Sequence, residues 1–202
     1  MHEKNQICNF FTVFIVVTIL MIYQSTREKI AYLMQEYQQL YKENKEALQE
    51  ITLAELPEMV YHSNAIENST LTLKDTEDIL LRDQIKKDHS VREVYEAKNL
   101  AKITEMLLKN PQQKLTIDLI LQLHGLLLHD INDTWAGKFR SGKQRVRVGS
   151  HIGANPTFVY ELMEELVSTY QTSNKEYFLD IIAYFHAEFE IIHPFCDGNG
   201  RI

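Results

Sequence analysis

The sequence predicts an all-α domain with one small β-hairpin, and three observations lead to this fold class. Glycine and proline are scarce, at 7 and 4 of 202 residues, so the chain has few turn-forming positions. Apolar residues recur at three- and four-residue steps in several long segments, which is the spacing of one helix face. Alternation at period two marks residues 144–149. A hydrophobic fraction of 45% and a charged fraction of 24% are typical of a globular protein.

The chain begins with an uncharged apolar segment, residues 7–23. As a helix it would measure about 26 Å, slightly less than the hydrocarbon core of a bilayer, which is about 30 Å thick. One interpretation is a single-span membrane anchor, and the lack of a small-residue cleavage site argues against a signal peptide. The other is an upstream extension of the reading frame outside the folded protein. Lys4, Arg27 and Lys29 favour a cytoplasmic location for the rest of the chain.

Seven helices are predicted in order along the chain. The first carries an apolar stripe that ends at Ile51, and Thr52 with Glu55 has the spacing of a capping box for the second. Pro57 falls in the first turn of that second helix, where proline is tolerated. The fifth is rich in leucine, and the seventh carries a stripe of phenylalanine and isoleucine. The predicted helices cover residues 25–51, 52–67, 75–86, 91–109, 116–129, 157–172 and 176–192.

Residues with special backbone preferences mark the predicted helix ends. Asn68 suits the left-handed conformation that ends the second helix, and Asn110-Pro111 stops the fourth. Asn155-Pro156 opens the sixth. The pattern divides the chain into a hydrophobic segment, a helical N-terminal region and a main domain, with bounds 1–24, 25–51 and 52–202.

Charge and cysteine content exclude some classes of protein. The formal net charge of −7 argues against nonspecific nucleic-acid binding through the whole surface, and we expect no direct nucleic-acid binding. A local basic strip runs through the predicted hairpin region, and a solvated hairpin face accounts for it equally well. The strip comprises Lys138, Arg140, Lys143, Arg145 and Arg147. Cys8 and Cys196 suggest neither a disulfide framework nor a zinc site, as in a protein of a reducing compartment.

The last ten residues hold the most informative side chains. Pro194 disfavours helical geometry at His193, so the seventh helix should end there with the imidazole at its negative pole. That position favours protonation of the ring. Gly198 and Gly200 let the backbone approach a ligand closely and present N–H groups to an anion.

Two more side chains complete a pattern suited to phosphate chemistry. Asp197 is a hard oxygen ligand of the kind that Mg²⁺ prefers, and Mg²⁺ commonly accompanies phosphates. Asn199 and Arg201 have donors for phosphate oxygens. A base, a carboxylate, a glycine nest and an arginine therefore lie within nine residues.

Three other interpretations of this region are weaker. Asp197 and Asn199 could open a calcium loop, but no acid follows at Arg201. The spacing of His186 from His193 could suggest a metal site, but a surface histidine explains His186 as well. Cys196 lacks the partners of a nucleophile, and we interpret it as a packing position.

The segment His193–Arg201 reads HPFCDGNGR, which resembles the signature of the Fic family of nucleotidyltransferases. Residues 189–192 are similar to the usual lead-in of that family. Residues 137–140 followed by 147–150 resemble the segment that leads into its flap, the hairpin that aligns a target peptide. Residues 63–68, SNAIEN, resemble its inhibitory motif (S/T)xxxE(G/N). The resemblance spans about residues 52–202 and implies a Fic-type helical domain with a β-hairpin flap.

The resemblance implies transfer of AMP from ATP to a Ser, Thr or Tyr hydroxyl of a target protein. His193 would be the general base, and Asp197 would hold Mg²⁺ at the phosphates. Gly198, Asn199 and Gly200 would cradle the phosphates, and Arg201 would hold the departing pyrophosphate.

Other residues would regulate the reaction or position its target. Arg147, Val148 and Gly149 would belong to the target-positioning flap. Ser63 and Glu67 would belong to an inhibitory helix at about residues 52–68, the arrangement of the N-terminally inhibited class. In the family, that glutamate pairs with a second arginine three residues after the first and blocks placement of the γ-phosphate.

Several expectations follow for the whole protein. We expect the reading frame to continue beyond Ile202 into the second arginine and further helices. Homodimerisation and membrane attachment through residues 7–23 fit the family and the apolar segment, with the catalytic domain in the cytoplasm. The alternatives are a Fic enzyme with another donor or with AMP-removing activity, and a non-catalytic or decayed interaction module.

Overall fold

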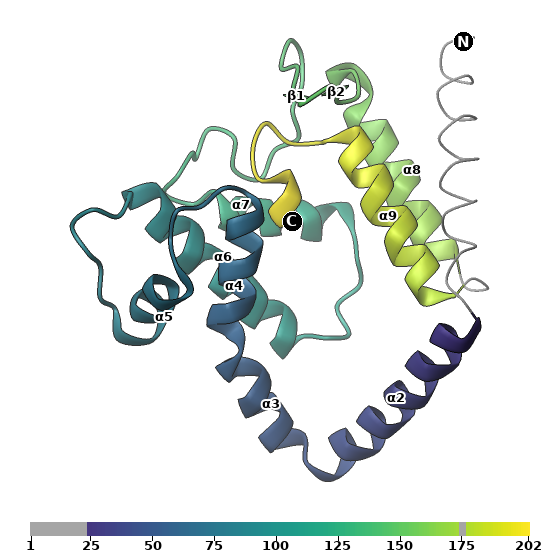
Figure 1. The fold of residues 1–202 in the computed structure, drawn as a ribbon. Coiled ribbons are helices and arrows are strands. Elements are labelled where there is room, and N and C mark those ends of the chain that lie inside the picture. The colour runs from purple at the N-terminus through teal and green to yellow at the C-terminus, as the bar shows by residue number, and fades with distance from the viewer. Residues whose placement is uncertain (1–23, 174–176) are drawn as a thin grey trace. The chain divides into compact units, whose positions relative to one another are not determined.

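The computed structural model describes residues 24–173 and 177–202, and they fold as helices with a two-stranded hairpin (Figure 1). This confirms the predicted fold class. The helices are α2 (Gln24–Glu43), α3 (Lys45–Ala54), α4 (Leu56–Ile66), α5 (Leu73–Arg82), α6 (Val91–Lys109), α7 (Ile117–Leu127), α8 (Val159–Thr172) and α9 (Phe178–Ile192). Two 3₁₀ turns are η1 (Pro156–Phe158) and η2 (Asn199–Arg201), and the strands are β1 (Arg147–Val148) and β2 (His151–Ile152).

The chain separates into two compact units, each described by itself. The described residues of one unit are 24–51 and 177–184, and those of the other are 52–173 and 185–202. In the described part of the chain, no helix has both the length and the apolar character needed to cross a bilayer. The predicted anchor at residues 7–23 lies outside the described residues.

Two predictions about the N-terminal helices were wrong. The single helix predicted for 25–51 is interrupted at Asn44, whose side-chain amide donates to the carbonyl of Leu40 at 3.4 Å. Asparagine competes for backbone groups in this way, and so it weakens a helix interior. Thr52 does not start a helix but lies within α3, and Glu55 occupies the N-cap of α4 without a side-chain cap. Pro57 does fall in the first turn of α4, as predicted.

Most of the remaining boundaries follow local signals, but α5 ends at Arg82, four residues before the predicted end at residue 86, because Asp83 takes the left-handed conformation at φ 52°. Helix α6 has the predicted bounds, and α4 ends at Ile66 with Asn68 in the left-handed region at φ 66°. Helix α5 begins two residues earlier than predicted because Thr72 and Asp75 form a capping box.

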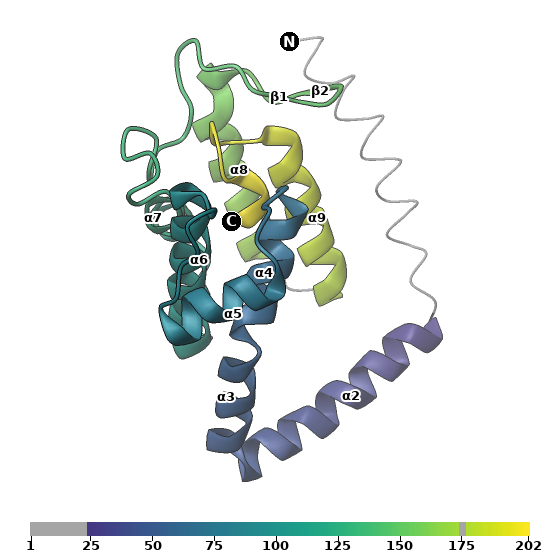
Figure 2. The ribbon, with the colours of Figure 1, turned by 60° about the vertical axis from the view of Figure 1, so that its left-hand side comes forward.

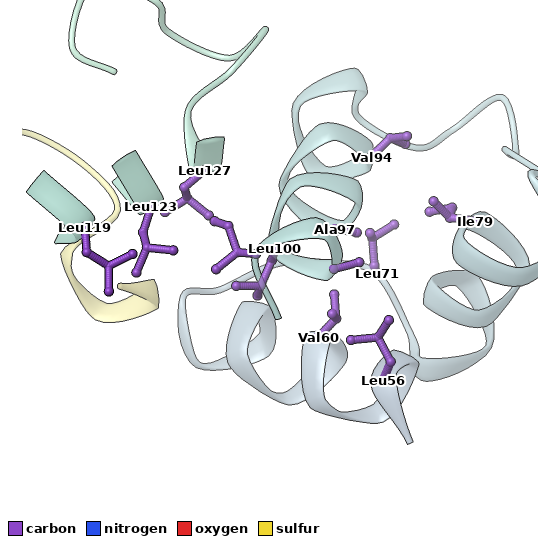
Figure 3. Close-up of a cluster of buried hydrophobic side chains, with 12 residues drawn as sticks. Leu56, Val60, Leu71, Ile79, Val94, Ala97, Leu100, Leu119, Leu123 and Leu127 are labelled. Carbon is purple, nitrogen blue, oxygen red and sulfur yellow. The ribbon is translucent and has the colours of Figure 1, made fainter. Parts of the chain in front are cut away.

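Helices α4, α5, α6 and α7 enclose one hydrophobic cluster (Figure 3). Its buried side chains include Val60 of α4, Ile79 of α5, Ala97 and Leu100 of α6, and Leu127 of α7. Burial of each large side chain stabilises the folded state by roughly 1.5–3 kcal/mol. The cluster therefore holds together the four helices that support the loop after α9.

A second cluster joins α7, α8 and the C-terminal half of α9. Its buried members include Met163 of α8 and Phe189 of α9, and Phe195 of the following loop packs into it with no exposed surface. The loop is therefore inserted into the core. In Figures 1 and 2 the hairpin lies beside the C-terminal end of α9, where the amide of Ala154 donates to the carbonyl of Ile192 at 3.1 Å.

Candidate active site

The backbone of His193 ends α9 as its proline neighbour requires. Its amide still donates to the carbonyl of Phe189 at 2.8 Å, but its φ is 51°, in the left-handed region. Pro194 excludes a further helical turn. The imidazole is buried, with Nδ1 3.5 Å from Oε2 of Glu190.

The electrostatic setting of His193 differs from the one that the sequence suggests. Position at the helix C-terminus favours protonation, but burial dominates and lowers the pKa of His193. The carboxylate of Glu190 opposes that shift, whereas Arg140 and His151 add to it. The effect of the helix end on protonation is therefore outweighed by burial. A neutral imidazole is the form that accepts a proton.

Arg140 is the largest fully buried side chain in the described residues, and this separates it from the rest of the basic strip. Its Nε donates to the carbonyl of His193 at 2.6 Å, and its terminal nitrogen donates to that of Ile192 at 2.8 Å. The backbone amide of Arg140 donates to the carbonyl of Pro194 at 2.9 Å. Arg140 thus caps the last carbonyls of α9, while the other four basic residues of the strip are exposed.

The apolar end of the loop is locked by Phe195 and Asn199. The side-chain oxygen of Asn199 accepts from the amide of Phe195 at 2.8 Å, and its Nδ2 donates to the carbonyl of Phe195 at 2.9 Å. Both functions of the buried Asn199 amide are therefore occupied within the loop. Cys196 between them is a half-buried thiol whose pKa is raised by burial, which suits a packing role.

His124 of α7 contacts the loop at Phe195 and Asp197, and no sequence pattern marked it as a site residue. Its ring stacks on Phe195 with centroids 3.6 Å apart. Its Nδ1 accepts from the amide of Gly137 at 3.1 Å, so Nε2 carries the proton and donates to the carbonyl of Asp197 at 3.0 Å. Burial lowers the pKa of His124 to about 4, which keeps this tautomer neutral.

No residue with a side chain fits at position 198 without backbone strain and a clash. Its φ is 79°, and a Cβ there would lie 2.8 Å from Cδ2 of Leu127. The backbone of the loop thus rests directly on α7. Residues 199–201 then form the 3₁₀ turn η2.

The charged end of the loop is held by α6. Asp197 pairs through Oδ2 with Arg92 and through Oδ1 with Arg201, at 3.4 Å for the latter. Oε1 of Glu96 lies 2.8 Å from Arg201 and 3.0 Å from Nε of Arg92. Arg92 and Glu96 were missed in the sequence because nothing in α6 itself marks them; only the tertiary packing brings them to the loop.

Glu67 of the predicted inhibitory motif reaches the glycine nest. It follows α4 as the C-cap, and its carboxylate lies against Gly200, where a Cβ would collide with Oε1 and stand 3.1 Å from Cδ. Ser63 lies one turn earlier in α4 and is half-buried. Residues more than 130 positions apart in sequence are therefore adjacent (Figures 1 and 2).

The predicted flap residues form an exposed hairpin apart from this charge cluster. β1 and β2 pair antiparallel, with Arg147 opposite Ile152 and Val148 opposite His151. Gly149 turns the chain at φ 58°, and Nε of Arg147 donates to its carbonyl at 2.9 Å.

The residues present fit a magnesium–phosphate ligand. Among the described residues, no group of three or more His, Cys, Asp or Glu side chains could hold a metal alone. Mg²⁺ commonly takes one or two carboxylates and completes its shell with water and substrate phosphates, so the single, partly exposed Asp197 is a sufficient anchor. Nε of Arg201 is buried without a partner in the structure, and a phosphate oxygen would satisfy it.

Solved structures define the class of fold. A Fic family protein from Desulfovibrio desulfuricans G20 superposes with a TM-score of 0.71 at 28% identity, covering 93% of this chain and 54% of that one. Fic-1 from Caenorhabditis elegans superposes with a TM-score of 0.67 at 25% identity, covering 88% of this chain and 55% of that one. The helical core, the hairpin and the inserted loop together are the Fic fold.

Sequence comparison then gives the family. Residues 114–202 match the model described as Fic/DOC family. "Protein adenylyltransferase fic-1" of Caenorhabditis elegans is 31% identical over 149 residues, which are 70% of this chain and 29% of the worm protein. "Protein adenylyltransferase Fic" of Nematostella vectensis is 28% identical over 193 residues, 88% of this chain and 45% of that protein. The chain belongs to the Fic/DOC family and spans less than half the length of these two relatives.

Proposed function

We propose that this chain carries the nucleotide-transfer site of a protein adenylyltransferase, which moves AMP from ATP to a protein hydroxyl. The observation that carries the proposal is the position of the Glu67 carboxylate against Gly200, in the same loop as the paired Asp197 and Arg201. In this proposal, the Glu67 oxygen at Gly200 takes a place that a phosphate oxygen of the nucleotide would take. The relatives named as protein adenylyltransferases support the same chemistry.

His193 performs the proton transfer in this proposal. Its neutral imidazole removes the proton of the target hydroxyl as that oxygen attacks the α-phosphorus. The new O–P bond forms as the bond to the β-phosphate oxygen breaks, and pyrophosphate leaves. The lowered pKa of His193 keeps the ring in its accepting form at neutral pH.

The rest of the loop binds and orients the nucleotide. Asp197 would hold Mg²⁺, which supplies charge neutralisation at the phosphates. The Gly198–Gly200 backbone and the unpaired Nε of Arg201 would contact phosphate oxygens. Asn199 acts indirectly here, because its amide closes the loop on Phe195. The exposed hairpin would align the segment that carries the acceptor Ser, Thr or Tyr.

Glu67 inhibits transfer in this proposal because it occupies the phosphate cradle. Its carboxylate is tethered at the end of α4, so it competes with the nucleotide at a high effective concentration. Release of the carboxylate, by a partner or by a change in oligomeric state, would open the site.

Label transfer tests the proposal directly. Protein incubated with α-³²P-labelled ATP and Mg²⁺ should label itself or a target protein, and the Glu67→Gly variant should do so at least about tenfold faster. An internal competitor worth ~1.4 kcal/mol lowers apparent affinity by that factor. His193→Ala should abolish labelling. The mass added to the target separates AMP from other transferred groups, and an unlabelled target with Glu67→Gly counts against the proposal.

We also propose that residues 7–23 tether the protein to a membrane with the transfer site in the cytoplasm. The uncharged composition of that segment supports the tether. Deleting residues 1–23 should move the protein from the membrane pellet to the supernatant. Equal partitioning of the two forms would remove the proposal.

A further inference from the structure

Glu96 contacts the loop from a helix that lies about 100 residues earlier in the sequence. Its Oε1 is 2.8 Å from NH1 of Arg201 and 3.0 Å from Nε of Arg92. Glu96 and Arg201 are both buried, with side-chain exposures of 11% and 3%. One carboxylate oxygen therefore anchors an arginine that no sequence motif connects to it.

The geometry makes Glu96 the principal partner of Arg201. The other contact of that guanidinium, NH2 to Oδ1 of Asp197, is 3.4 Å and thus near the limit of a hydrogen bond. A buried guanidinium without a well-placed anion is strongly disfavoured, so Glu96 decides where Arg201 rests. The planar group held through NH1 still has its Nε–H free of protein partners in the structure.

The same oxygen also shapes the surroundings of Asp197. Arg92 is held through Nε by Glu96 while its NH2 pairs with Asp197. Glu96 is thus the shared partner of two arginines. Arg92 pairs with Asp197, the proposed Mg²⁺ ligand, and Arg201 belongs to the loop itself.

We propose that Glu96 is a positioning residue for nucleotide binding and transfer, and that it acts by fixing Arg201. The inference rests on the proposed function, and it adds α6 to the machinery of that site. Glu96 does not touch the reacting atoms itself. It sets the direction in which the guanidinium presents its remaining donors to the β-phosphate.

The test uses Glu96→Gln in the full chain carrying Glu67→Gly, with Glu105→Gln as the matched control. Glu105 lies nine residues further along the same helix and also pairs with a cation, Lys109 at 3.1 Å, but its side chain is 43% exposed and forms no ion pair with the loop among the described residues. A charge-assisted hydrogen bond exceeds a neutral one by an amount equivalent to about a tenfold change in binding or rate. We therefore expect kcat/KM for ATP to fall about tenfold and the Kd for Mg-ADP, measured by calorimetry, to rise at least about threefold.

A double-mutant cycle separates positioning from a general structural role. If Glu96 acts through Arg201, then adding Glu96→Gln to Arg201→Lys should lower kcat/KM and Mg-ADP affinity by less than about twofold further. A merely structural Glu96 would lower the melting temperature without changing either nucleotide readout relative to Glu105→Gln. That result, or full additivity in the cycle, would overturn the proposal.

Two further arms keep the outcomes distinct. If Glu96→Gln does not fold, Glu96→Asp retains the charge but withdraws it from Arg201, and the same two losses are expected. If the Glu67→Gly parent transfers no AMP but Glu96→Gln still weakens Mg-ADP binding, the positioning role stands and the transfer assignment fails. If the parent transfers AMP and Glu96→Gln matches Glu105→Gln in both readouts, the transfer assignment stands and the positioning role of Glu96 fails.

Discussion

The loop at residues 193–201 and the hairpin at residues 147–152 are neighbours with opposite physical characters. Phe195 in the loop is fully buried, and the side chains around it are bonded to one another or to α6 and α7. The hairpin has only two paired residues in each strand, and Val148 and Ile152 are 53% and 60% exposed.

Under the proposed function, this difference would correspond to two separate roles. A group that transfers protons or holds phosphates must be positioned before substrate arrives, and insertion into a core achieves this. A surface that pairs with different target segments needs free backbone edges and exposed apolar side chains, and a short hairpin provides them. Predictions that act unequally on the two regions test this division.

The largest expected effect is on the loop's own chemistry. His193→Ala, in the Glu67→Gly background, should lower kcat by about 10³-fold, because general-base catalysis commonly contributes 10²–10⁴-fold. His186→Ala is the matched control, since this exposed histidine lies two turns earlier on α9. Initial rates of AMP transfer give the measurement, and equal losses in the two variants would show that His193 is not the base.

The second prediction compares two left-handed glycines. Gly198→Ala should lower the free energy of unfolding by about 3–4 kcal/mol, from left-handed strain and from overpacking against Leu127. Gly149→Ala in the hairpin should cost only roughly 1–2 kcal/mol, because its φ is 58° but nothing lies within 4 Å. Urea unfolding of both variants measures the gap, and similar costs would mean that the loop is not packed tightly on α7.

The third prediction concerns the acid response of the loop support. His124 has a folded pKa of about 4 against an ordinary value of 6.5, so the unfolded state binds more protons below pH 6.5. The free energy of unfolding should therefore fall as pH drops from 7.5 to 5, by about 2 kcal/mol from this residue. His193 adds to the fall in the same direction, since its pKa is also lowered.

His124→Gln should flatten that response by the same amount. Urea titrations at pH 7.5 and pH 5 check it. A slope that the substitution leaves unchanged would mean that His124 is not the buried neutral group described above.

The smallest effect on stability is expected in the hairpin. Ile152→Ser should change the free energy of unfolding by less than about 0.5 kcal/mol, because the side chain is exposed. It should still lower transfer to a protein target while self-labelling and Mg-ADP binding stay constant. A comparable loss in all three readouts would contradict a role confined to target alignment.

Local signals in the sequence predicted local structure well. Pro194 ends α9 at His193, Asn68 ends α4 in a left-handed turn, and α6 has the predicted bounds. These outcomes depend on φ preferences and capping, which act over a few residues.

Contacts between distant segments were not visible in the sequence. His124, Glu96 and Arg92 reach the loop from helices whose periodicity shows only which residues are apolar. Arg140 lies within a basic strip, and only the packed structure distinguishes this buried residue from its exposed neighbours. At Thr52 a local pattern also failed. The predicted capping box does not form there, because α3 continues through this residue.

Arg140 links the backbone of His193 to the segment that leads into the hairpin. Through its side chain it grips the carbonyls of Ile192 and His193, and through NH1 it donates to that of Gln144 at 3.3 Å, just ahead of β1. One buried guanidinium therefore ties the backbone at the end of α9 to the backbone that leads into the hairpin. If His193 is the base and the hairpin binds the target segment, as proposed, this side chain would fix the distance between them, and that distance would favour acceptor hydroxyls at a matching distance from the bound target backbone.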